Sequence, residues 1–410
     1  MTDQPFHAEI DKLRAETRQR IRLIIDAAVP NVAPALGISV WQAGAPWYEA
    51  YAGWVDPETE VTPVGYRSLW DLASVSKLFT ATALLRLAAD FKLDLDDPIA
   101  GLLPEFADGG SRGVDGGMDP LTWEVLRTPP ERAEWSVDPG TVTYRQLLSH
   151  TGGLAPWRTV FRAAGPVPPP PDEVDPVAPE ARGDAALAAI SGYRFVARPG
   201  TEFHYSDLGF MLVGLAVARR FGGSLPDAMQ ALIRDRLGLD SLTYRPLAVG
   251  RPRGRMVPTE VDARWRKRRC WGEVHDENAA GLGGVAGHAG LFSTVHDVAR
   301  FGVAWLRQDP RLRLPRFLRT AVTDQTPGLG AARGLGWQVQ PTDHLAPFSG
   351  EAYGHTGFTG TSLAVDPRRD LVVAICTNRV YHGREPAGID RLRLQLHSVF
   401  ASTSEAGLAP

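Results

Sequence analysis

The chain has 410 residues, of which 44% are apolar and 22% are charged, and its formal net charge is −3. This length allows a large core, built as two lobes or as one domain with a long insertion. The slightly acidic balance excludes an overall basic surface, so we expect no nucleic-acid partner. No apolar run reaches the about 18 residues that a membrane-spanning helix needs, so we expect no membrane partner.

The cysteine count and the N-terminal segment bear on the cellular compartment. Only Cys270 and Cys376 are present, and two cysteines give no disulfide framework. Residues His7–Val29 mix charged side chains with apolar ones at helical spacing, which predicts an amphipathic helix and not a signal peptide. The sequence therefore predicts a cytoplasmic protein.

The predicted elements form an α/β (α+β) chain. Two β-like runs, Leu36–Gln42 and Trp47–Trp54, suggest a hairpin, and the apolar helix Leu78–Ala89 follows. Helices are predicted along the middle of the chain at Thr143–His150, Asp207–Phe221 and Val298–Leu306. The C-terminal part returns to strands and closes with a helix, at Gly336–Gln340, Thr361–Asp366, Leu371–Thr377 and Gly388–Ala401.

This order predicts one antiparallel sheet built from both chain ends and flanked by helices, with an inserted lobe that is mostly helical. We place the sheet domain at residues 1–90 and 285–410, and the inserted domain at residues 91–284. Three loops stand out by composition: the Pro-rich Gly165–Pro179, the Arg-rich Arg251–Arg269 and the Gly-rich Gly281–Gly290. The first two are expected to lie at the surface, and the third to allow close approach of backbones.

Ser74 and Lys77 are the most informative pair. Residues three apart on a helix share a face, so a primary hydroxyl lies beside an amine. Lysine is rare here, since 40 of the 44 basic residues are arginine. Arginine stays protonated because its pKa lies above about 12, whereas a partly buried lysine can lose its proton. The pair therefore predicts a serine nucleophile with a lysine as proton acceptor.

Other catalytic and cofactor motifs are missing from the sequence. There is no G-x-S-x-G elbow, no H-E-x-x-H zinc motif and no phosphate-binding ending in the Gly-rich loop. His275, His288 and His296 lie among turn residues without ligand spacing, so we expect no metal and no cofactor. His150, beside Ser149, is expected to cap or pack and not to form a dyad with it.

Two polar triplets come later in the chain. Tyr205-Ser206-Asp207 stands at the head of an apolar helix, where the phenol could relay a proton if a cation such as Lys77 stabilised its phenolate. His355-Thr356-Gly357 precedes a predicted strand, and a triplet ending in glycine at a sheet edge can leave a backbone N–H free for an oxyanion. Each triplet is also compatible with a purely structural role.

Taken together and in this order, the three motifs resemble those of the serine β-lactamase and penicillin-binding-protein superfamily. Those enzymes carry Ser-x-x-Lys, Tyr-x-Asn and Lys-Thr-Gly, and the resemblance to the class C β-lactamase-like branch, which includes esterases and D-amino-acid peptidases, covers about residues 30–400. The resemblance implies that Ser74 forms an acyl-enzyme and that Lys77 and Tyr205 share proton transfer. It also implies an oxyanion hole made by the backbone N–H groups of Ser74 and Phe358.

Two departures from the family pattern bear on the substrate. Asp207 stands in place of Asn, and an ionised carboxylate cannot donate to an amide carbonyl and would hold Lys77 charged more strongly. His355 stands in place of Lys, and a neutral imidazole would bind a substrate carboxylate less firmly. With Thr356, Gly357 and Phe358 these residues are the expected substrate and oxyanion contacts. If His355 contacts the substrate, activity should change near the ordinary histidine pKa of about 6.5.

The sequence thus favours a cofactor-independent serine hydrolase that acts on a small ester, as a carboxylesterase for short acyl groups. The first alternative is a D-Ala peptidase or β-lactamase that acts on cell-wall-like amides. The second is a non-catalytic penicillin-binding or scaffold protein. Steady release of an acyl group, as opposed to a stable adduct, separates turnover from binding.

Overall fold

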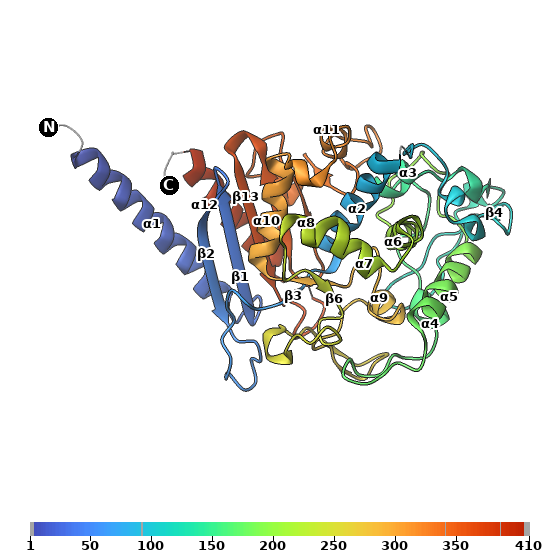
Figure 1. The fold of residues 1–410 in the computed structure, drawn as a ribbon, viewed down its shortest axis with the longest axis horizontal. Helices are drawn as coiled ribbons and strands as arrows, with labels where there is room; N and C mark the ends of the chain where they lie inside the picture. Colours follow the sequence, from blue (N-terminus) through green and yellow to red (C-terminus); the bar gives the residue numbers. More distant parts are fainter. Residues whose placement is uncertain (1–3, 92, 341, 386, 406–410) are drawn as a thin grey trace.

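In the computed structural model, the described residues are 4–91, 93–340, 342–385 and 387–405. They include a six-stranded antiparallel sheet with the strand order β10-β11-β12-β13-β1-β2. Figure 1 labels the strands β1, β2 and β13 of this sheet. Its strands are β1 (Ala35–Gln42), β2 (Ala45–Gly53), β10 (Gln338–Val339), β11 (Tyr353–Thr356), β12 (Ser362–Asp366) and β13 (Leu371–Thr377). The sheet is therefore built from both chain ends, as the sequence predicts.

The two chain ends meet where β1 pairs with β13, in a register that opposes Leu36 to Thr377. All residues of β13 are buried, because both faces of the sheet are covered. Its consecutive residues Val372 and Val373 point to opposite faces and belong to different apolar clusters. A strand that is covered on both faces needs a continuous apolar sequence, which explains why β13 does not alternate with polar residues.

Helices form the layers on either side of this sheet. The N-terminal helix α1 (Gln4–Ala28) and the C-terminal helix α12 (Ile389–Glu405) cover one face, and α10 (Val295–Leu306) and α2 (Ser76–Phe91) lie on the other side (Figure 1). α12 ends beyond the predicted boundary at Ala401. α1 begins at Gln4, before the predicted start at His7, and ends at Ala28, just before the predicted end at Val29.

The middle of the chain is mostly helical and loop-rich. Its helices are α3 (Tyr144–Leu148), α4 (Val160–Ala163), α5 (Pro179–Gly192), α6 (Asp207–Phe221), α7 (Leu225–Met229), α8 (Asp235–Leu237), α9 (Glu277–Gly281) and α11 (Leu318–Ala321). A small three-stranded sheet in the order β3-β9-β6 consists of β3 (Trp70–Asp71), β9 (Leu291–Ser293) and β6 (Thr243–Tyr244). Two further pairs of short strands are β4 (Arg112–Gly113) with β5 (Ser136–Val137), and β7 (Val261–Asp262) with β8 (Arg268–Arg269). The division into two domains at residues 90 and 285 stays a prediction.

Several local expectations agree closely with the structure. α6 spans the predicted segment, and α3 begins after Thr143, whose side chain forms a capping box with Gln146. The predicted strand Gly336–Gln340 is much shorter, because only β10 pairs with the neighbouring strand. The close backbone approach expected of the Gly-rich loop occurs at Gly287, where an added Cβ would lie 2.1 Å from the carbonyl oxygen of Phe210.

No single described helix is long and apolar enough to cross a membrane, although the bent pair formed by α6 and residues Leu225–Leu237 meets that test by length and composition.

Candidate active site

Ser74 lies in the 3₁₀ turn Ala73–Val75, directly before α2. The backbone just before it is fixed from two sides. The Leu72 N–H donates to the Leu291 carbonyl of β9 at 3.0 Å, and the Thr361 hydroxyl donates to the Leu72 carbonyl at 2.9 Å. The candidate nucleophile is thus held between the small sheet and the large one.

Ala73, the residue before the nucleophile, has a left-handed backbone with φ 46°. A residue with a Cβ adopts this conformation only where its surroundings enforce it. The buried carboxylate of Asp71 does so, because it accepts from the Ala73 N–H at 2.9 Å and from the His275 N–H at 2.6 Å. Burial raises the pKa of Asp71, and the two backbone donors oppose this rise. Asp71 thus positions the turn that carries Ser74.

Lys77 is fully buried and reaches three acceptors. Its Nζ lies 2.9 Å from Ser74 Oγ, 3.2 Å from the His288 carbonyl and 2.8 Å from Asp207 Oδ1. The first two contacts are hydrogen bonds, and the contact with Asp207 is an ion pair. Burial alone would lower the pKa of Lys77, but Asp207 and Tyr205 outweigh burial and hold that pKa above its ordinary value. The resting group is therefore an ammonium, which corrects the expectation of a lysine that has lost its proton.

The Tyr205-Ser206-Asp207 segment brings its first and last residues to Lys77. Ser206 caps α6, since its hydroxyl accepts from the Gly209 N–H at 3.2 Å, and this places Asp207 in the first helical turn. The positive end of a helix favours a carboxylate there. The Lys77 ammonium also lies 4.8 Å from the centroid of the Tyr205 ring. A cation within about 6 Å of a ring centroid is attracted by the ring, so Tyr205 lies in contact with Lys77.

His150 packs against this segment, as expected from the sequence. Its Nδ1 accepts from the Ser206 N–H at 3.0 Å, and its ring centroid lies 4.4 Å from that of Tyr205. Burial, followed by the charge of Lys77, lowers the pKa of His150 well below its ordinary value. His150 is therefore a neutral imidazole that positions Tyr205.

The His355-Thr356-Gly357 triplet ends β11 against the turn that carries Ser74. A Cβ on Gly357 would lie 2.1 Å from the Thr361 hydroxyl and 2.7 Å from the Leu72 carbonyl, so only glycine fits. This close approach brings the backbone leading into Phe358 against the segment before the nucleophile. The two chain segments expected to supply oxyanion-hole N–H groups are therefore adjacent.

His355 is buried and its tautomer is fixed by its neighbour. Its Nδ1 lies 2.7 Å from the Thr356 carbonyl, which can only accept, so Nδ1 carries the proton and Nε2 is an acceptor. Burial first, then the charges of Lys77 and Arg333, lower the pKa of His355 well below its ordinary value. This corrects the expectation of a change in activity near the ordinary histidine pKa, because His355 is already neutral there.

Asp207, Asp276 and His288 form a cluster whose candidate ligand atoms all lie within 4.8 Å of one another, among the residues that the structure describes. Their atoms already have partners. His288 Nε2 lies 2.8 Å from Asp276 Oδ1, and Asp207 forms the ion pair with Lys77. A metal ion here would face the Lys77 ammonium, so the donor set fits the lysine charge better than a metal.

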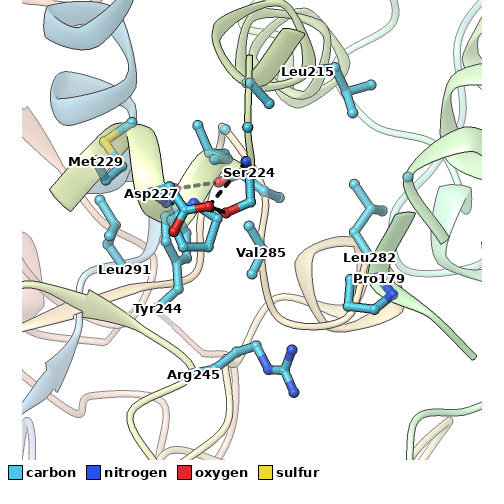
Figure 2. A pocket seen from close by; sticks show the side chains of 18 of the residues that line it. Pro179, Leu215, Ser224, Asp227, Met229, Tyr244, Arg245, Leu282, Val285 and Leu291 are labelled. Carbon is cyan, nitrogen blue, oxygen red and sulfur yellow. Dashed lines mark hydrogen bonds between the residues drawn. The ribbon is translucent and has the colours of Figure 1, made fainter. Parts of the chain in front are cut away.

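A pocket of about 940 Å³ lies behind the Gly-rich loop, and Ser74, Lys77 and Tyr205 are not among its lining residues. Figure 2 shows its apolar wall with Leu215, and Arg245 at one side. The pocket approaches the active-site region at Gly287, the neighbour of the residue whose carbonyl accepts from Lys77, and at Leu291, whose carbonyl accepts from the Leu72 N–H.

Comparison with known proteins shows the family of this chain. The Beta-lactamase family model matches residues 22–397, so the chain belongs to this family of serine hydrolases. A protein of Escherichia coli strain K12 named "Putative D-alanyl-D-alanine carboxypeptidase" is 29% identical over 333 residues, which cover 76% of this chain and 69% of that protein.

Two solved structures share the fold at low identity. "EstCE1, a hydrolase with promiscuous acyltransferase activity" has a TM-score of 0.68 at 19% identity, covering 94% of this chain and 99% of that one. "A class C beta-lactamase" has a TM-score of 0.65 at 16% identity, covering 95% and 97%. These likenesses support the β-lactamase-like architecture expected from the motifs.

The structure brings Ser74, Lys77, Tyr205 and Asp207 together, with His355 beside Tyr205 at 6.0 Å between ring centroids and Gly357 against Leu72. Their catalytic roles, and the roles of Thr356 and Phe358, stay predictions. Reasoning from the sequence missed Asp71 and Arg333, and it gave His150 no place at the site. Asp71 lies close before Ser74 in sequence, which was the available signal. Arg333 lies in a loop without a motif, so nothing in the sequence pointed to it.

Proposed function

We propose that the protein hydrolyses small carboxylic esters through an acyl-enzyme on Ser74. The observation that carries this proposal is the position of Lys77 Nζ, 2.9 Å from Ser74 Oγ and 2.8 Å from Asp207 Oδ1. It joins the nucleophile, a buried cation and a carboxylate through one hydrogen bond and one ion pair.

The proton path follows from the charge of Lys77. An ammonium cannot accept the Ser74 proton, so Tyr205 as phenolate accepts it while Ser74 attacks the ester carbonyl. Tyr205 then returns this proton to the departing alkoxide. Water attacks the acyl-serine by the same route and releases the acid. Backbone N–H groups of Ser74 and Phe358 stabilise the tetrahedral oxyanion.

The choice of ester over amide rests on Asp207. A carboxylate in an ion pair accepts hydrogen bonds only, so it cannot hold a substrate amide through its carbonyl oxygen. His355 adds to this, because Nδ1 is taken by the Thr356 carbonyl and Nε2 cannot donate. Neither position offers the donor that an amide substrate with a carboxylate would use. The name of the E. coli relative favours a D-alanyl-D-alanine carboxypeptidase as the second candidate.

Steady-state kinetics with p-nitrophenyl acetate and butyrate test the proposal, with nitrocefin and a D-alanyl-D-alanine peptide run alongside. Ester turnover that is lost in Ser74→Ala and kept in Ser136→Ala, a variant at an exposed serine, is the expected result. Ester turnover that survives Ser74→Ala would overturn the nucleophile. Peptide turnover exceeding ester turnover would favour the carboxypeptidase, and a stable acyl adduct without release would favour a binding protein.

A further inference from the structure

Arg333 lies beside the candidate active site and pairs with no carboxylate among the described residues. Its Nε and Nη1 are both buried and have no hydrogen-bond partner, and no other arginine in the described ranges has two such nitrogens. Its guanidinium lies 5.0 Å from the centroid of the Phe203 ring. A buried donor left unpaired costs about 1–3 kcal/mol and more when charged, so this arrangement needs a reason.

The position of Arg333 is fixed by its backbone. Its N–H lies 3.0 Å from the Thr326 hydroxyl and 3.2 Å from Asp324 Oδ1, to which it donates. Three residues on, the Gly336 N–H donates to the Leu148 carbonyl at 2.9 Å, in the helix that precedes His150. The side chain is thus delivered to the active site by an ordered loop and is not a mobile surface arginine.

The charge of Arg333 acts on the Tyr205 side of the site. Its guanidinium packs on Phe203, whose ring centroid lies 6.1 Å from that of His150, and the His150 ring lies 4.4 Å from the Tyr205 ring. The Arg333 charge accordingly contributes to the low pKa values of His150 and His355. The other cation, Lys77, is balanced by Asp207, and both imidazoles are neutral. Among the described residues no carboxylate forms an ion pair with Arg333. Once Tyr205 has taken up the Ser74 proton in the proposed mechanism, this side of the site therefore carries an unbalanced positive charge.

We propose that Arg333 binds a carboxylate on the leaving group, so that the substrates are acyl esters of hydroxy acids; this rests on the ester hydrolysis proposed above. Tyr205 returns its proton to the departing oxygen, and Arg333 acts on the Tyr205 side, which places the anion on the alcohol half of the ester. A planar guanidinium matches a carboxylate with paired N–H donors. Ser74 takes the acyl group as the ester C–O bond breaks, and the hydroxy acid leaves with the proton from Tyr205.

A matched pair of substrates tests this: 3-acetoxybenzoate and its methyl ester, which share the acyl group and differ in one charge on the leaving phenol. The measured quantity is the ratio of kcat/KM for the acid to that for the methyl ester. We expect this ratio to fall at least about tenfold in Arg333→Gln. Arg333→Lys, which keeps the charge without the fork, should give an intermediate ratio. Arg319→Gln, a matched loss of charge at an exposed arginine of α11, should leave the ratio unchanged.

An equal ratio in wild type and Arg333→Gln would overturn the proposal while leaving ester hydrolysis intact. An Arg333-dependent preference for phenyl hydrogen glutarate over its methyl ester, with none for the first pair, would overturn the placement on the leaving group. If wild type turns over neither ester, calorimetry with 3-hydroxybenzoate decides the matter separately. Binding at least about tenfold weaker in Arg333→Gln supports the subsite even if ester hydrolysis fails, and equal binding overturns it.

Discussion

The ion pair of Lys77 with Asp207 offers the sharpest test of the charge state on which the mechanism depends. Asp207→Asn keeps a carbonyl oxygen near Lys77 Nζ but removes the negative charge. Lys77 is fully buried, so its ammonium would lose the main group that offsets desolvation. The pKa of Lys77 should then fall below its ordinary value, because burial becomes the largest remaining influence.

The magnitude follows from the burial of the pair. Breaking a buried ion pair by removing one partner costs about 3–5 kcal/mol. The Asp207 side chain is 18% exposed and Asn retains an acceptor, so we expect a cost at or just below the lower limit of that range, about 2–3 kcal/mol at pH 7.

The pH dependence has a definite sign. In wild type the pKa of Lys77 is raised, so its stabilising contribution is fully present below the unfolded lysine pKa and is lost only as pH rises through the folded one. In Asp207→Asn the folded state releases the proton before the unfolded state does. The penalty should therefore shrink as pH rises, by about 1.4 kcal/mol per pH unit between the variant's Lys77 pKa and about 10.4.

Urea unfolding of wild type and variant at pH 7 and pH 9.5 measures both quantities. Asp96→Asn is the matched control, because it removes a carboxylate from an exposed pair with Arg145, where Asp96 is 61% exposed. That change should cost at most about 1 kcal/mol. An Asp207→Asn penalty below about 1 kcal/mol at pH 7, or one that does not shrink at pH 9.5, would refute an ammonium at Lys77 held by Asp207.

Two further predictions concern the His355-Thr356-Gly357 triplet. Because the pKa of His355 is lowered well below its ordinary value, the pH profile of kcat/KM for p-nitrophenyl acetate should show no inflection caused by His355 near pH 6.5. A wild-type inflection at about pH 6.5 that disappears in His355→Gln would contradict this. Gly357→Ala places a Cβ 2.1 Å from the Thr361 hydroxyl, so we expect destabilisation of about 2 kcal/mol in thermal unfolding and a drop in kcat larger than the change in KM. Gly350→Ala is the control and should have a mild effect, because its added Cβ meets no atom within 4 Å. Equal effects of the two changes would contradict the close packing at Gly357.

Much of the fold could be predicted because its signals are local. The apolar run of β13, the capped start of α3 and the length of α6 all follow from periodicity, capping residues and turn chemistry. Boundaries failed where pairing with a neighbour decides them, as at β10, since a strand ends where its hydrogen-bonding partner does. The pairing of Ser74 with Lys77 was also local, because one helical turn sets their spacing.

The sequence by itself determined which groups are available: a serine and a lysine on one helix face, a tyrosine and a carboxylate at a helix start, and a glycine after a histidine. Only the tertiary structure decided their charge states. Lys77 is an ammonium because burial is outweighed by Asp207, and His355 is neutral because it is buried near two cations. Burial and Coulomb interactions depend on distances between segments far apart in the chain, so no local pattern encodes them. For the same reason the sequence did not point to Arg333, because only the structure shows that its buried nitrogens meet no acceptor among the described residues.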